Sequence, residues 1–349
     1  MPLLSIGLPI MAQPGPRQRR VDTEWVLLTS GTSGRPKMVL HSLQSLTGAI
    51  SRKPDVAARE VWSTFYDIRR YGGLQILLRA LIGSADLVLN NPDEPIDKQL
   101  ARLGAAGVTS ISGTTSHWRR VLMSRDRGAF APSYIRLSGE IADQGALDAL
   151  RVAFPGARIG HAYASTEAGV GFAVDDGREG FPVALVDEPA DGVEMKVIDG
   201  ALHIRSRRTA SRFVGPSASP LRDSEDYIDT ADLVERRGDR YYFVGRRSGI
   251  INVGGLKVNP EEVETVLNGH PAVRASRVSG RKNPVTGAIV VAEVVTRGAS
   301  TSDGALGREI LAHCGERLQR HKMPAVIRFV EKLDLSPAGK LKRQGAARD

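Results

Sequence analysis

Three copies of one local pattern constrain how the first half of this 349-residue chain folds. Residues 74–89, 96–112 and 145–165 each begin with apolar side chains at helical spacing and end in a short apolar run. Helices that alternate with short apolar strands are typical of an α/β domain, because each helix carries the chain back to the next parallel strand. We therefore predict a largely parallel sheet.

The pattern changes after about residue 190. Residues 193–206 and 233–245 alternate polar and apolar side chains around turn-forming residues, which predicts antiparallel hairpins. After a glycine-rich break, the sequence predicts a small C-terminal domain with helices at 260–269 and 304–320 and strands at 273–278, 289–295 and 326–330. The predicted fold class is α/β, with a mostly parallel sheet and a small β-subdomain in the large domain, plus a small α+β domain.

These patterns also predict the domain boundaries. Residues 1–20 form an irregular, proline-rich leader, residues 21–247 a large domain, and residues 248–349 a mobile C-terminal domain. The leader has no basic start before its apolar run, unlike a secretory signal, and no stretch reaches the roughly 18 apolar residues of a membrane span.

The composition is that of an ordinary globular protein, with 41% hydrophobic and 25% charged residues. The net charge of +9 suits a protein that handles phosphates, but the basic residues are scattered without interleaved aromatic residues. We therefore expect no nucleic-acid partner. A single cysteine, Cys314, rules out a disulfide framework and fits a reducing cytoplasm, and the seven histidines lack metal-ligand spacing.

A glycine- and hydroxyl-rich segment follows the apolar run at 25–29. From residue 38 on, the apolar side chains have helical spacing. Glycines let a backbone approach a ligand closely, while hydroxyls, free amides and a lysine bind phosphate oxygens. The segment differs from the Walker loop in its glycine spacing. We predict that it binds nucleotide phosphates through Thr29, Ser30, Gly31, Thr32, Ser33, Gly34 and Lys37.

Residues 28–39, LTSGTSGRPKMV, resemble the signature loop of the adenylate-forming superfamily, which usually has glycine where Met38 stands. That superfamily includes acyl-CoA synthetases, aryl-CoA ligases, luciferases and peptide-synthetase adenylation domains. Its members typically carry a further domain-sized portion before this loop. The resemblance therefore implies a truncated large domain that lacks an N-terminal subdomain, or a missing N-terminal partner.

Two further segments resemble motifs around the adenine and the α-phosphate. Ser138, Gly139 and Glu140 are similar to the segment that lines the adenine. Residues 163–167, YASTE, are similar to the YGxTE motif. The resemblance implies that Tyr163 stacks on adenine, that Thr166 meets the α-phosphate in catalysis, and that Glu167 holds Mg²⁺, which favours carboxylate oxygens.

The remaining motifs lie toward the C-terminus. Asp232, in YIDTAD, and Arg246, in GRRSGII, match the residues that bind the ribose, and Ser248 takes the position of the hinge. The segment with Gly254, Gly255 and Lys257 resembles the part of the pantetheine tunnel found in acyl-CoA synthetases. Lys340, in SPAGK, takes the place of the catalytic lysine.

The resemblance implies ATP-dependent activation of a carboxylic acid to acyl-AMP, then transfer to the thiol of CoA or of a carrier protein's pantetheine. ATP, Mg²⁺ and CoA are the expected cofactors. Two alternatives remain: amino-acid adenylation for a carrier protein, with Asp67 holding the amine, and a non-catalytic nucleotide-binding remnant or subunit of a split enzyme. The sequence leaves the acid open, although Arg69 and Arg70 offer contacts for an anionic acyl group or for CoA phosphates.

Overall fold

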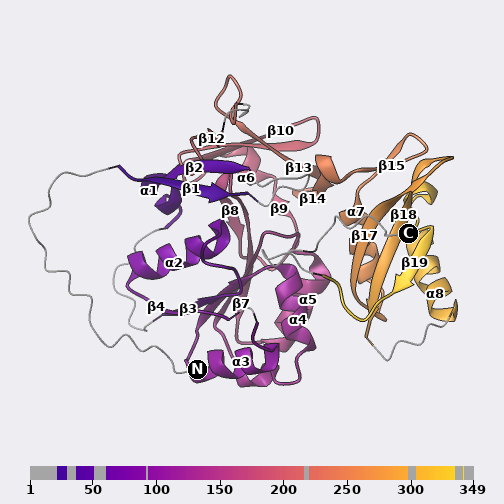
Figure 1. Ribbon diagram of the computed structural model, residues 1–349, viewed down its shortest axis with the longest axis horizontal. Coiled ribbons are helices and arrows are strands. Elements are labelled where there is room, and N and C mark those ends of the chain that lie inside the picture. Colours follow the sequence, from indigo (N-terminus) through magenta and orange to yellow (C-terminus); the bar gives the residue numbers. More distant parts are fainter. Residues whose placement is uncertain are drawn as a thin grey trace, which may run out of the picture.

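The structure is a computed structural model that describes residues 22–29, 37–50, 60–91, 93–215, 220–297, 304–334 and 341. Figure 1 shows two parts: a larger one built around sheets and helices, and a smaller one formed by the C-terminal elements. No helix in the described ranges is both long enough and apolar enough to cross a membrane.

A six-stranded sheet with the order β4-β3-β5-β6-β7-β8 forms the centre of the larger part. Its strands are β3 (Val61–Thr64), β4 (Asp86–Val88), β5 (Ser110–Gly113), β6 (Tyr134–Ser138), β7 (Arg158–Ser165) and β8 (Gly169–Val174). All neighbours are parallel except β7 and β8, which are antiparallel. The predicted, largely parallel sheet is therefore confirmed.

Helices cover both faces of this sheet. They are α2 (Tyr71–Gly83), α3 (Ile96–Ala105), α4 (Thr115–Met123) and α5 (Gln144–Ala153). On one face, Leu100, Trp118 and Leu147 of α3, α4 and α5 join a buried core with Ile111 and Leu137 of the sheet. On the other, α2 packs against β3 through a smaller cluster. A short 3-10 helix, Arg127–Ala129, precedes β6.

The predicted β-subdomain is a five-stranded antiparallel sheet with the order β10-β11-β13-β14-β9. Its strands are β9 (Phe181–Pro182), β10 (Val193–Ile198), β11 (Ala201–Ser206), β13 (Ile228–Arg237) and β14 (Arg240–Arg246), and α6 (Ala184–Asp187) lies beside β10. Phe172 of β8 and Phe181, Leu202 and Ile204 of this sheet share one buried cluster. That cluster fastens the two sheets together.

The segment after the predicted phosphate loop corrects a sequence-based expectation. Residues 38–42 form a strand, not the start of a helix: β2 (Met38–Ser42) pairs with β1 (Glu24–Leu28) and with β12 (Arg212–Val214). Pairing on both sides outweighs the helical spacing. A reciprocal capping box between Ser42 and Ser45 then begins α1 (Leu43–Thr47).

β1 also differs from the fully buried strand that its apolar run predicted. Leu27 faces the core, but Val26 and Leu28 are 51% and 56% exposed. Strand side chains alternate between two faces, and one face of this small sheet packs on the rest of the domain. The run WVLLT therefore belongs to a half-buried strand.

The smaller part contains β15 (Ile251–Val253), β16 (Leu256–Val258), α7 (Pro260–Asn268), β17 (Val273–Asn283), β18 (Gly287–Thr296), α8 (Gly304–Gly315) and β19 (Val326–Phe329). Its helices and sheet enclose one apolar core. The predicted α+β character is confirmed, but the helix expected over 304–320 ends at Gly315, and a 3-10 turn, Arg320–Lys322, follows.

Another 3-10 helix, Arg247–Gly249, lies near the predicted domain boundary at residue 247. The boundary itself stays a prediction.

Candidate active site

The candidate site lies at the carboxyl ends of the parallel strands β6 and β7, the usual ligand-binding edge of an open α/β sheet. Ser138 is the last residue of β6, and its carbonyl accepts a 2.6 Å hydrogen bond from the Tyr66 hydroxyl. Gly139 follows with a φ of +84°, a left-handed conformation that favours glycine. The turn brings Glu140 toward the start of α4, where one carboxylate oxygen accepts the Ser116 N–H at 2.7 Å.

Three residues expected around the adenine and ribose contact one another. The Tyr163 hydroxyl donates to Asp232 at 2.6 Å, and Arg246 Nε lies 2.9 Å from the other Asp232 oxygen, an ion pair without hydrogen-bond geometry. Burial, and then the Asp232 charge, raises the pKa of Tyr163 well above its usual value, so the phenol stays protonated and donates. The ring stacks on Phe172 and Phe243, with centroid distances of 5.7 and 5.3 Å.

Ala231, next to Asp232, adopts a left-handed backbone with a φ of +57°. The resembling motif has glycine at this position, where the conformation would carry no penalty from Cβ. An alanine there costs on the order of 1–2 kcal/mol. The substitution from the family pattern therefore places backbone strain directly beside the candidate ribose-binding carboxylate.

Thr166 and Glu167 lie in the turn between β7 and β8. The Glu167 carbonyl accepts the Ala210 N–H at 2.9 Å, which holds the turn against the chain before β12. The Glu167 carboxylate makes no hydrogen bond or ion pair with any residue that the structure describes. This half-buried carboxylate is therefore available to a cation.

His41 is a candidate site residue that sequence reasoning missed. Its Nε2 lies 2.7 Å from the Thr166 carbonyl, and its Nδ1 lies 2.9 Å from Ser45 Oγ. A carbonyl can only accept, so Nε2 carries the proton and Nδ1 accepts from the Ser45 hydroxyl. Burial lowers the pKa of His41, and the bond to Thr166 opposes this shift, so the ring is neutral at pH 7. His41 thereby fixes the position of Thr166.

The two ends of the predicted phosphate loop meet at the β1–β2 hairpin. The Thr29 N–H donates to the Lys37 carbonyl at 2.8 Å, and Thr29 is buried. The Lys37 amine lies 5.1 Å from the centroid of the Phe213 ring. Residues Ser30, Gly31, Thr32, Ser33 and Gly34 lie outside the described ranges.

The C-terminal segment reaches the same edge of the sheet. The Leu341 N–H donates to Glu140 Oε1 at 2.9 Å, across 201 residues of sequence. The predicted catalytic residue, Lys340, precedes Leu341 but lies outside the described ranges. The contact nevertheless joins the part of the chain that follows Lys340 to the predicted adenine-lining segment.

Gly254 and Gly255 form the turn of the β15–β16 hairpin, with φ values of +58° and +84°. Two consecutive positive φ values are what a tight two-residue hairpin needs, which explains the glycine pair. Lys257 is exposed on β16, and the hairpin packs on β18 of the smaller part. These three residues therefore belong to the smaller part, whereas Tyr163, Asp232 and Arg246 cluster in the larger one.

Among the described residues, no group of three or more His, Cys, Asp or Glu side chains could hold a metal ion. The expected Mg²⁺ role of Glu167 therefore rests on one carboxylate and on phosphate oxygens that a nucleotide would supply. It stays a prediction.

Comparison with protein families identifies the chain. The model of the AMP-binding enzyme family matches residues 10–207, and that of the AMP-binding enzyme C-terminal domain matches residues 262–340. This chain belongs to the AMP-binding enzyme family. The resemblance to adenylate-forming enzymes that the motifs indicated is therefore confirmed.

Individual relatives of this AMP-binding enzyme agree with the family assignment. The 2-succinylbenzoate–CoA ligase of Geobacillus kaustophilus is 27% identical over 91% of this chain and 68% of its own length. The fatty acid–[acyl-carrier-protein] ligase MmaC of Mycobacterium marinum is 26% identical, over 92% and 67%. A crystal structure of the anthranilate CoA ligase AuaEII with anthranoyl-AMP superposes with a TM-score of 0.77, at 20% identity, over 91% of this chain and 65% of that one.

The structural likeness confirms the predicted fold class. The chain spans about two thirds of the length of these relatives.

Proposed function

We propose that this protein uses ATP to convert a carboxylic acid into an acyl-adenylate and then transfers the acyl group to a thiol. The observation that carries the proposal is the hydrogen bond between Leu341 and Glu140. It brings the segment that follows the predicted catalytic lysine to the sheet edge that holds Tyr163, Thr166 and Glu167. Such a juxtaposition suits one nucleotide held from two sides.

The first step joins two anions, so the site must neutralise charge and hold the reactants in line. A substrate carboxylate oxygen attacks the α-phosphorus, the bond to the β-phosphate oxygen breaks, and pyrophosphate leaves with that electron pair. In this proposal Lys340 lies between the carboxylate and the α-phosphate, which stabilises the charge of the transition state. The phosphate loop, with Thr29 and Lys37 at its ends, holds the β- and γ-phosphates.

The geometry of the described residues supports the remaining roles. The Glu167 carboxylate, which has no partner among the described residues, fits a hard cation, and Mg²⁺ bound there would offset phosphate charge. Asp232 and Arg246 form one ion pair that can bind the ribose hydroxyls, and Tyr163 orients Asp232. His41 holds the Thr166 carbonyl, which fixes the threonine next to the α-phosphate.

The second step requires a thiol from outside the chain. Burial raises the pKa of Cys314 to about 11, so this thiol stays protonated and enclosed in the core of the smaller part. CoA, or the pantetheine of an acyl carrier protein, is the acceptor that we propose, with the Gly254–Gly255 turn and Lys257 forming part of its channel after a rotation about Ser248. A single buried cysteine also suits a reducing cytoplasm.

Asp67, on which the amino-acid alternative depends, already has a partner. Its carboxylate is bridged by Arg69, with Nε–Oδ1 and Nη2–Oδ2 distances of 2.9 and 2.8 Å. The hydrogen bond from Arg69 lowers the pKa of Asp67. A substrate ammonium group would have to displace this guanidinium, which is 87% exposed and therefore holds the carboxylate only weakly, so the panel of acids below decides this alternative.

The test is pyrophosphate release trapped with hydroxylamine, measured with a panel of acyl, aryl and amino acids. We expect release with at least one acid, and we expect Lys340→Ala to abolish it while ATP still binds. ATP binding without pyrophosphate release from any acid would support the non-catalytic alternative. Release at a near-normal rate by Lys340→Ala would refute the role of that lysine.

A further inference from the structure

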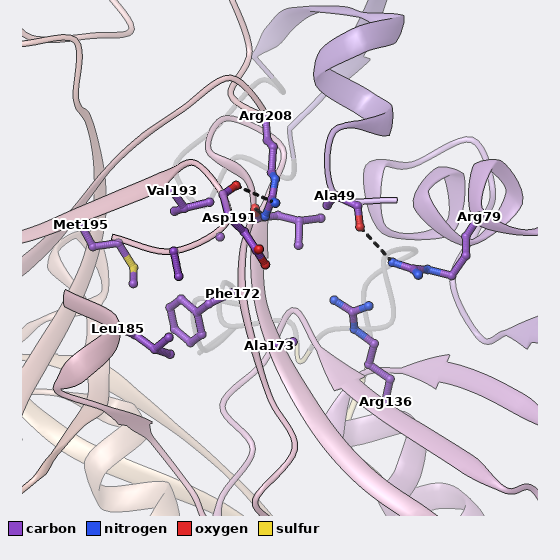
Figure 2. A pocket seen from close by; sticks show the side chains of 13 residues that line it. Ala49, Arg79, Arg136, Phe172, Ala173, Leu185, Asp191, Val193, Met195 and Arg208 are labelled. Carbon is purple, nitrogen blue, oxygen red and sulfur yellow. Dashed lines mark hydrogen bonds between the residues drawn. The ribbon is translucent and has the colours of Figure 1, made fainter. Parts of the chain in front are cut away.

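A cavity of about 190 Å³ lies beside the strands of the candidate site (Figure 2). Val170 of β8 lines it and pairs with Ala164 of the YASTE segment on β7. Arg136 of β6 lines it two residues before Ser138, and alternate residues of a strand share a face. Two residues of strand span roughly 7 Å, so the backbone of Arg136 lies about that far from Ser138 of the predicted nucleotide site.

Three arginines from separate elements line this cavity: Arg79 of α2, Arg136 of β6, and Arg208 after β11. Figure 2 shows Arg79 directed toward the Ala49 carbonyl and Arg136 directed into the space beside it. Arg208 donates to the Asp191 carbonyl at 2.9 Å, and Arg79 donates to the Ala49 carbonyl at 3.4 Å. Among the described residues, Arg136 has no hydrogen bond and no ion pair.

The cavity is short of negative charge. Asp191 is the acidic residue among its lining residues, against three guanidinium groups. Glu60, whose carboxylate also accepts the Trp62 indole N–H, attracts Arg79 through space. Burial, and then the neighbouring charge of Arg136, lowers the pKa of Arg79. Clustered, partly buried cations are costly without an anion, and a guanidinium fork matches a carboxylate or sulfonate in two parallel hydrogen bonds.

The opposite side of the cavity is apolar. Phe172, Leu185, Val193 and Met195 line it, so the space suits a compact apolar body that ends in an anion. Its volume is below the roughly 300–1,000 Å³ of pockets for drug-sized ligands, which favours a short chain or a single ring.

We propose that Arg136, supported by Arg79, binds a second anionic group of the acyl substrate, so that the protein activates short dicarboxylic or sulfo-carboxylic acids. This inference rests on the proposed function for the fate of the other carboxylate, which lies toward Thr166. The carboxylate or sulfonate on Arg136 takes no part in the chemistry. It anchors the acid and selects against acids that lack it, because their binding leaves the arginines without an anion.

Matched acids test the proposal. Butyrate is compared with succinate and 3-sulfopropionate, and benzoate with isophthalate and 3-sulfobenzoate, by pyrophosphate release. We expect kcat/KM for at least one doubly anionic acid to be at least about 10-fold higher than for butyrate or benzoate, its singly anionic counterpart. In Arg136→Gln we expect kcat/KM for that acid to fall about 10- to 100-fold, with no such fall for the singly anionic acid. The two anion types separate carboxylate from sulfonate recognition. Equal activity on singly and doubly anionic acids, unchanged in Arg136→Gln, would overturn the inference.

Two variants guard against an effect on folding. Arg136→Lys keeps the charge but loses the fork and should retain part of the preference, whereas Arg125→Gln, at an exposed arginine outside the cavity, should retain all of it. The KM for ATP should stay unchanged in all variants.

A binding measurement separates failure of this inference from failure of the proposed function. If no acid releases pyrophosphate, the proposed function fails. Titration calorimetry with succinate, 3-sulfopropionate, isophthalate and 3-sulfobenzoate then decides the subsite by itself: binding of at least one of them to the wild type and weaker binding to Arg136→Gln support it, and equal binding to both proteins or no binding of any of the four refutes it. Arg79→Gln provides the same comparison if Arg136→Gln does not fold.

Discussion

The carboxylate of Glu140 binds two distant backbone amides: Oε1 accepts the Leu341 N–H at 2.9 Å while Oε2 accepts the Ser116 N–H at 2.7 Å. Leu341 follows the predicted catalytic lysine, and Ser116 begins α4. One side chain thus ties the C-terminal segment to the sheet edge.

Removing this connection should slow the first chemical step. Hydrogen bonds to a charged acceptor are worth about 1.5–3 kcal/mol, so we expect Leu341→Pro, which lacks the N–H, to lower the rate of pyrophosphate release about 10- to 100-fold. Leu341→Ala keeps the N–H and should stay near the wild-type rate. The ATP dissociation constant should hardly change, since the bond lies outside the nucleotide.

Glu140→Ala tests the same bond from its other end. Since both changes remove one interaction, the double variant should be no slower than the more affected single variant. Fully additive losses would show that the two residues act independently.

His41→Ala should lower adenylation while the fold persists. The substitution removes the donor that holds the Thr166 carbonyl at 2.7 Å, so Thr166 loses its fixed position. We expect kcat for pyrophosphate release to fall about 10-fold, with a smaller change in the KM for ATP. His41→Gln, which can donate from its amide nitrogen, should recover part of the rate. Wild-type kinetics in His41→Ala would rule out a positioning role.

The sequence predicted much of the fold and of this site, and His41 and β2 show where prediction stops. Helices such as α3 and α5 are strongly periodic, so their type follows from local pattern. The five residues of β2 fit both helical and strand spacing. Pairing with β12, which lies 172 or more residues later in the chain, decides for the strand. The role of His41 depends on a contact across 125 residues, which neither metal-ligand spacing nor a local motif signals.

The titration of His117 should lower the free energy of unfolding in mild acid. Burial, and then the charge of Arg120, lowers the pKa of His117 from 6.5 to about 4. Above pH 6.5 the ring is neutral in both the folded protein and the unfolded chain. As the pH falls from 6.5 toward 4, the unfolded chain binds a proton that the folded protein excludes, and about 3 kcal/mol of stability is lost.

His117→Gln isolates this effect, because glutamine at the third helical position preserves the reciprocal cap with Thr114. Urea unfolding at pH 7 and pH 4.5 should show a smaller loss in His117→Gln than in the wild type. An identical loss would assign the acid sensitivity to other groups, such as His41 and His161, whose pKa values burial also lowers.

Arg240 should be among the most costly residues to replace outside the site. Its guanidinium is 2% exposed and donates to Asp176 at 2.7 Å and to the carbonyls of Arg178, Glu179 and Gly180 at 3.2, 2.9 and 3.1 Å. These bonds fasten the loop between β8 and β9 to β14. Arg240→Met keeps most of the volume but leaves the acceptors unpaired, and we expect a loss of about 3–5 kcal/mol in the free energy of unfolding. Arg236→Met, at an exposed position on β13, should change it by less than about 0.5 kcal/mol in urea unfolding. If the two variants unfold at the same urea concentration, then the loop between β8 and β9 does not depend on the buried guanidinium.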